Sequence, residues 1–422
     1  MKSRINELIQ HTKEKLGLQD YYLYRSDVRR SATILGDTIY TLSMEWFPNY
    51  EKDLLDEDLN PDGTAVVEVN LHTGQFTSVI FVSGISYAEG VKLSIEDSNA
   101  VVRWIESETG LQEGTHFVFH KREDKRMSFR KILNGVSVSP SGSIEVEVDE
   151  AGNLTFFSIY GDFSKKETFN REKYEITLPQ VKHIVAEQLK LAEFPSMETE
   201  KMTPAYAIEE VYIRNRDLSL IPFQLVEDER SHVDVHKIIE WSHAIDKAFQ
   251  RKEINATESL SQNQIENQEP HPDLRKITEK EIKNSVVAVQ QFLAQVYSSD
   301  SGKWVLQSLS RSEGYLLAKL QAKHEAEQVF KRQLKLFIHS NTYEVLNYMD
   351  NKSFIDLYLA FRAADKVIIA KQEALKRLRD FMILTPCYVY DRKQGRYVLC
   401  GKLDCHYAVN AITGEVVSLD DL

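Results

Sequence analysis

Cysteine is scarce in this chain and is confined to one end of it. The 422 residues include 3 cysteines, at Cys387, Cys400 and Cys405. A small, odd number of cysteines is not a disulfide framework, which needs pairs and is typical of small secreted domains. The count fits a reducing compartment. We therefore expect a cytoplasmic protein.

Long apolar runs are also missing. A membrane-spanning helix needs about 18 apolar residues in succession, and no such run occurs. The stretch from Met1 to Gln10 carries charge but lacks the apolar core of a secretory signal. The formal net charge is -12 and the pI about 5.6, which disfavours attraction to nucleic acid or to an anionic membrane. We expect no signal peptide, no membrane insertion and no nucleic-acid partner.

The sequence motifs of common catalytic sites are absent. We find no G-x-S-x-G elbow, no P-loop and no G-x-G-x-x-G fingerprint. Carboxylates are plentiful, but no spacing among them isolates an acid/base pair. The sequence therefore predicts no catalytic residue and no organic cofactor. We expect a protein that is not an enzyme, and an enzyme with an unrecognised site is kept as an alternative.

What the chain does contain is a recurring order of one helix followed by several strands. Its length suggests about three domains. The first round predicts a helix at 4–17 and strands at 21–35, 38–47, 64–70 and 75–82. The second predicts a helix at 94–109 and strands at 115–121, 126–133, 142–148 and 153–159. Asn134-Gly135 predicts a hairpin, because a type I′ turn needs positive φ at both central residues.

The remainder predicts a third, less regular round and a change of pattern after it. The third round has a helix at 178–192 and strands at 204–214, 219–226 and 232–241, the last without a glycine turn behind it. We predict an α+β fold with units at 1–92, 93–172 and 173–252, a polar linker at 253–274, a helical segment at 275–386 and closing hairpins at 387–422.

Two groups of residues have side chains that could bind a metal ion. Cys387, Cys400, Cys405 and His406 supply the atoms of a Cys₃His zinc site, but no pair has the usual two-residue spacing. Free, partly buried cysteines are the other interpretation. His232, Asp234 and His236 alternate on a predicted strand and would share one face. An exposed polar face is the alternative for them.

Two hairpin segments resemble those of a known family. They are Ala408-Val-Asn-Ala-Ile-Thr-Gly-Glu-Val-Val-Ser418, preceded by Tyr397 to Cys405, and Asn134 to Val138 with Ile144 to Asn153. With these segments the chain resembles the PepSY-like superfamily, and within it the YcdB/YcdC-type repeat proteins. The resemblance implies cystatin-like units, in which a helix lies across an antiparallel sheet. The second segment is also similar to propeptides of thermolysin-type proteases.

The resemblance implies a function in binding rather than in catalysis. Related propeptides are implied to assist or inhibit a peptidase by packing against it. The expectation for this chain is a non-catalytic protein that binds or inhibits another polypeptide, with a peptidase as one candidate partner. The alternative is a metal- or redox-responsive protein that uses Cys387, Cys400, Cys405 and His406, with zinc as the metal.

Overall fold

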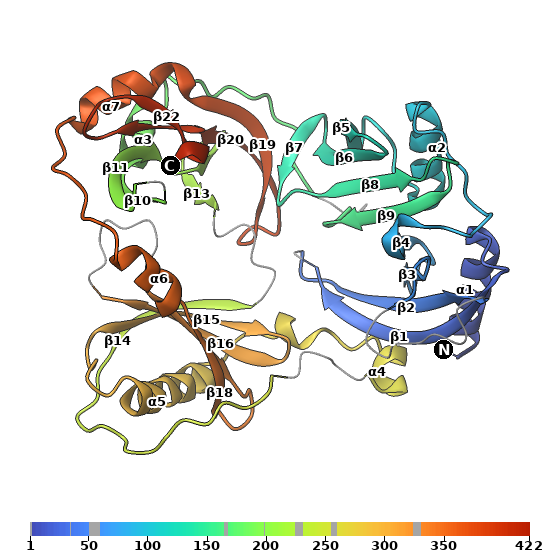
Figure 1. Cartoon of the computed structure of the whole chain (residues 1–422), viewed down its shortest axis with the longest axis horizontal. Helices are drawn as coiled ribbons and strands as arrows, with labels where there is room; N and C mark the ends of the chain where they lie inside the picture. Colours follow the sequence, from blue (N-terminus) through green and yellow to red (C-terminus); the bar gives the residue numbers. More distant parts are fainter. Residues whose placement is uncertain are drawn as a thin grey trace. The chain divides into compact units, whose positions relative to one another are not determined.

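The computed structural model describes residues 2–33, 35–49, 60–163, 168–197, 199–223, 231–254, 260–323 and 331–422. It has the predicted α+β fold, with antiparallel sheets and helices packed on them (Figure 1). The chain divides into two compact units. Unit 1 comprises Met1–Glu172, Glu258–His271 and Cys387–Leu399, and unit 2 comprises Lys173–Thr257, Pro272–Pro386 and Cys400–Leu422.

Unit 1 begins with one helix and an antiparallel meander. The elements are α1 (Lys2–Leu16), β1 (Tyr21–Ala32), β2 (Thr38–Pro48), β3 (Ala65–Asn70) and β4 (Phe76–Phe81). Each strand pairs with the next, as in the register that sets Val67 opposite both Met44 and Val79. Along β3 every second residue is buried, which is the pattern of a sheet with one face on the core. The predicted first helix and its four strands are confirmed.

The second round has the predicted helix and four strands, and one additional strand, β7. Its elements are α2 (Ser98–Thr109), β5 (Phe117–Glu123), β6 (Arg126–Leu133), β7 (Val136–Ser139), β8 (Ser143–Val148) and β9 (Leu154–Tyr160). Asn134 and Gly135 have φ of 54° and 78°, which confirms the hairpin turn. Ser78 of β4 lies opposite Ser158 of β9, so the two rounds share one sheet. β7 also pairs in parallel with β19 (Ile383–Asp391).

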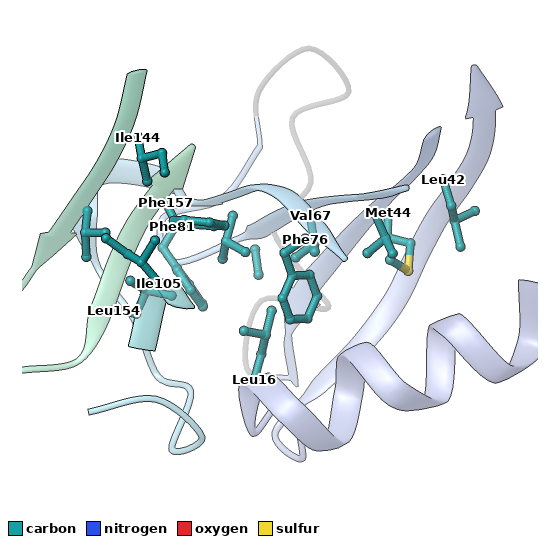
Figure 2. Close-up of a cluster of buried hydrophobic side chains, with 14 of the residues drawn as sticks. Leu16, Leu42, Met44, Val67, Phe76, Phe81, Ile105, Ile144, Leu154 and Phe157 are labelled. Carbon is teal, nitrogen blue, oxygen red and sulfur yellow. The ribbon is translucent and has the colours of Figure 1, made fainter. Parts of the chain in front are cut away.

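One hydrophobic core serves both rounds of unit 1. Leu16 of α1 and Ile105 of α2 belong to the same buried cluster as Phe76 and Phe157 of the sheet (Figure 2). Both helices follow the amphipathic pattern, with apolar residues three and four apart. Burial of each such side chain stabilises the fold by roughly 1.5–3 kcal/mol. The expected division at residue 92 therefore does not separate two cores.

Unit 2 contains a second helix-and-sheet layer assembled from distant parts of the chain. Its elements are α3 (Lys182–Gln188), β10 (Leu189–Ser196), β11 (Lys201–Ile208), β12 (Val211–Arg214), β13 (Leu220–Pro222), α7 (Lys371–Leu378), β20 (Arg396–Asp404), β21 (Tyr407–Asn410) and β22 (Val416–Ser418). β11 pairs with β21, and β12 pairs with β20. Ala374 and Leu378 of α7 lie in one core with Val185 and Val409. The closing hairpin is thus covered by a helix that precedes it.

The predicted helical segment at 275–386 is wrong. It holds α5 (Glu279–Val296), α6 (Lys352–Leu359) and α7, but also β15 (Trp304–Ser312), β16 (Tyr315–Ala322), β17 (Gln333–Ile338) and β18 (Val345–Asp350). The strand Tyr315–Ala322 reads YLLAKLQA, and most of these residues favour helices. Burial nevertheless alternates along it, with Leu316, Ala318 and Leu320 inward. Packing against α5 therefore overrides local propensity.

Two further boundaries differ from the sequence prediction. β14 (His232–Ile239), expected in the third round, pairs with β15 and so belongs to the sheet of α5. The expected linker at 253–274 includes α4 (Gln262–Glu266), whose Ile265 is buried in the core of unit 1. Tyr40 fixes this segment by donating hydrogen bonds to the carbonyls of Gln264 and Glu269, at 3.2 and 2.7 Å. Residues 255–259 of the linker lie outside the described residues. No described helix is both long and apolar enough to span a bilayer.

A five-residue turn with threonine at its fourth position closes the strand pairs at 70–74, 339–343 and 410–414. In each, the first side chain accepts hydrogen bonds from the backbone N–H groups two and three residues later. The distances are 3.0 and 3.0 Å for Asn70, 3.2 and 3.2 Å for His339, and 2.9 and 3.1 Å for Asn410. Such local bonds replace ladder bonds and so favour a turn. The same side-chain-to-backbone hydrogen bonds therefore form a strand-connecting turn in each of three sheets.

The fifth residue of this turn is left-handed in all three copies. The φ values are 75° at Gly74, 60° at Tyr343 and 81° at Gly414. Glycine is the usual residue there, because it has no Cβ to clash. Tyr343 is the exception, and with His339 it hides the middle copy from a search for Asn and Gly. The fourth residue is threonine in every copy, and its hydroxyl accepts the N–H two residues on.

The backbone of Gly17, just after α1, packs closely against the backbone of Gly90. We therefore predict that Gly17→Ala destabilises unit 1. A Cβ on Gly17 would lie 2.2 Å from the backbone nitrogen of Gly90, and φ of Gly17 is 69°. Positive φ costs about 1–2 kcal/mol and overpacking about 1–3 kcal/mol more. Urea unfolding measures the loss. Gly114→Ala is the control, because its φ is 75° but its Cβ meets nothing within 4 Å. Equal losses for both variants would contradict the close approach.

Candidate functional site

The three cysteines are buried in the structure. Cys387 lies in unit 1, and Cys400 and Cys405 lie in unit 2. None of the three forms a disulfide, and the residues are 4%, 0% and 2% exposed. The Cys405 thiol lies 3.4 Å from the carbonyl oxygen of Tyr407, and burial raises the pKa of Cys405. All three positions are therefore buried and outside any disulfide.

The four candidate zinc ligands are not gathered into a ligand set. His406 is exposed, whereas its neighbour Cys405 points into the core, as expected from alternation along an extended chain. Within the described ranges no three His, Cys, Asp or Glu side chains lie together as ligands for a metal ion. Cys387, Cys400, Cys405 and His406 therefore do not form the predicted arrangement.

The second candidate set is interrupted by a β-bulge. His232 and Asp234 do lie on one face, with Nε2 of His232 3.0 Å from Oδ1 of Asp234. The register then shifts between Asp234 and Lys237, and His236 has φ of 48°. Nδ1 of His236 lies 3.0 Å from Oε1 of Gln307 instead. A bulge adds one residue to a strand and re-aims a side chain. His236 therefore does not follow the alternation of side chains that places His232 and Asp234 on one face.

The sheet of β14 to β18 has its helix on one face. α5 lies along the sheet (Figure 1). Its Val289, Phe292 and Leu293 belong to one buried cluster with the inward residues of the strands. Because side chains alternate, the intervening residues of β16, β17 and β18 lie on the opposite face. We call five of them the outer patch. The outer patch consists of Leu317, Lys319, Lys335, Phe337 and Met349.

Apolar and basic side chains lie next to each other on the outer patch. The register sets Leu317 opposite Phe337, and Lys319 opposite Lys335, which in turn is opposite Met349. Both lysines are exposed, Leu317 and Phe337 are half-buried, and Met349 is 60% exposed. Facing positions on neighbouring strands bring Cβ atoms to about 4.5–5.5 Å. The patch is therefore one continuous surface.

Lys319 and Lys335 are like charges that lie directly opposite each other on β16 and β17. Like charges directly opposite on a sheet destabilise it. In the described part of the chain no carboxylate oxygen lies within 4.0 Å of either amine. Ser308 faces Lys319 from β15, and Met349 faces Lys335 from β18, so the nearest cross-strand neighbours are neutral. Among the described residues the pair has no local counter-charge, so its repulsion costs stability.

Elsewhere on the same sheet the buried charges are neutralised. Nη2 of Arg311 lies 2.7 Å from Oε1 of Glu281, and both side chains are largely buried. Burial alone would raise the pKa of Glu281, but hydrogen bonds from Thr278 and Arg311 hold it below its usual value. Arg332 forms an ion pair with Asp350. Lys319 and Lys335 differ from these arginines, because no ion pair is found for either lysine among the described residues.

Unit 1 has a shallow hollow lined by Glu96, Arg122 and Lys125. It has a volume of about 610 Å³ and is lined by charged residues of both signs. Arg122 pairs with Glu96, Nη1 to Oε2 at 3.1 Å, and Lys125 with Glu150 at 3.2 Å. The hydrogen bond from Arg122 lowers the pKa of Glu96. A carboxylate held ionised in an ion pair is a poor general base near neutral pH. Glu96 is therefore a weak candidate for a general base in this hollow.

Comparison with known proteins adds little to this description. No family model matches the chain, and no curated protein matches it. Among solved structures, the chain is similar to the Bacillus megaterium YpeB C-terminal domain. The alignment covers 82% of this chain and 96% of that chain, at 12% sequence identity and a TM-score of 0.27. The fold therefore rests on the helices and strands described above.

We predict that the thiols of the native protein react slowly with an aromatic disulfide reagent. The thiolate is the reactive form, and burial both blocks access and raises the pKa of Cys405. Spectrophotometric thiol counting at neutral pH measures the rate. The same protein in denaturant is the control and should react at all 3 cysteines. Rapid labelling of the native protein would show that the cysteines are accessible.

Proposed function

We propose that this protein is non-catalytic and binds another polypeptide through the outer patch. The observation that supports this is the sheet of β14 to β18, which has α5 on one face and leaves Leu317, Phe337 and Met349 together on the other. Apolar side chains grouped on an exposed face favour association, because covering them removes apolar surface from water. A polypeptide partner supplies the area that such an interface needs, about 800 Å² from each side.

A more specific version of this proposal is that the bound polypeptide is a peptidase and that binding inhibits it. It follows from the resemblance to PepSY-like units and propeptides. The outer patch does not distinguish an inhibitor from other binding proteins, since both use exposed apolar side chains beside charged ones. The proposal for this chain is therefore polypeptide binding, with peptidase inhibition as the first activity to assay once a partner is identified.

The proposal predicts that Met349→Asp weakens binding of the partner. Tagged wild-type protein is used to recover a stoichiometric partner from a native lysate of cells that make it, and the dissociation constant is then measured with the purified partner. A charge in an apolar contact should raise it by about tenfold or more. Ile368→Asp is the matched control, because Ile368 is 71% exposed in the same unit but outside the outer patch.

Three results would contradict the proposal. The first is recovery of no stoichiometric partner by the wild-type protein. The second is an equal loss of affinity for Met349→Asp and Ile368→Asp, which would place the interface elsewhere. The third is turnover of a substrate by the purified protein, since the proposal is of a non-catalytic function.

A further inference from the structure

We infer that the segment bound at the outer patch is acidic, with Asp or Glu side chains beside apolar ones. The inference rests on the proposed function and specifies the chemistry of the partner. It comes from Lys319 and Lys335, which face each other across β16 and β17 with no counter-charge among the described residues around them. A carboxylate of the partner, placed between the two ammonium groups, would supply their counter-charge.

The physical argument begins with the cost of the pair. Two ammonium groups on facing residues repel each other, and the repulsion is reduced when a carboxylate accepts hydrogen bonds from both. Covering the patch also removes water and so strengthens the attraction. The charges thus add a preference for an acidic segment to the apolar attraction of Leu317, Phe337 and Met349.

The apolar residues of the patch distinguish a polypeptide from other anions. A phosphate backbone offers charge but no apolar side chain to cover Met349, which is 60% exposed. The formal net charge of -12 also opposes non-specific attraction to DNA or to an anionic membrane. An acidic polypeptide has the same unfavourable net charge, but it gains the apolar contacts at a specific site. The observations therefore favour the polypeptide.

The inference is tested with peptides graded in net charge at constant apolar content. They are measured against the full-length wild-type chain and the double variant Lys319→Gln, Lys335→Gln. We expect the wild type to prefer acidic peptides by about tenfold over their Gln-substituted counterparts, with a preference that falls as salt is raised. The double variant should lose that preference. The control is Lys280→Gln, Lys283→Gln, which removes two exposed lysines from α5 on the other side of the sheet.

Each outcome decides between the inference and the function on which it rests. Peptides that bind without regard to charge, but more weakly to Met349→Asp, would overturn the acidic partner and leave polypeptide binding intact. An acidic preference that survives Lys319→Gln, Lys335→Gln would place the acidic site elsewhere and also overturn the inference. Binding of no peptide would contradict both. Tighter binding of phosphatidylserine vesicles or duplex DNA than of any peptide, lost in the double variant, would assign the lysines to a different partner.

Discussion

The alternation of side chains along paired strands is the constraint on which the rest of this structure depends. A slip of one residue would move every inward side chain to the solvent face. The recurring five-residue turn holds this register in three sheets, because its first side chain accepts two backbone N–H groups and its fifth residue is left-handed. Leu316, Ala318 and Leu320 are inward for this reason, and Leu317 and Lys319 are outward.

The helices decide which face of each sheet becomes the core. α1 and α2 serve one continuous sheet in unit 1, and α5 serves the sheet of β14 to β18 in unit 2. Because α5 packs on one face of this sheet, the residues on the opposite face are not needed for that core. On that face Lys319 and Lys335 reduce stability slightly, whereas the buried charges Arg311 and Glu281 are paired. This contrast is the physical reason why we propose the outer patch as a binding surface.

Sequence patterns predicted the elements well where turn residues and periodicity agreed. The hairpin at Asn134-Gly135 and the first two rounds formed as expected. The strands from Trp304 to Asp350 were missed, because helix-favouring residues occupy them and because His339 and Tyr343 replace the usual Asn and Gly of the turn. The threonine at the fourth position, Thr342, was the signal that could have identified this copy. The outer patch was missed for the same reason, since it lies on those strands.

The sequence by itself determined the α+β class, the early helices and strands, and the glycine-containing turns, because local conformation and spacing depend on nearby residues. Only the tertiary structure decided that both early rounds share one core, that β14 joins the sheet of α5, and that Lys319 faces Lys335. In the described structure, no three of the candidate ligands Cys387, Cys400, Cys405 and His406 lie together. These outcomes depend on strand pairing between distant segments, and a single sequence contains no direct record of which strands pair.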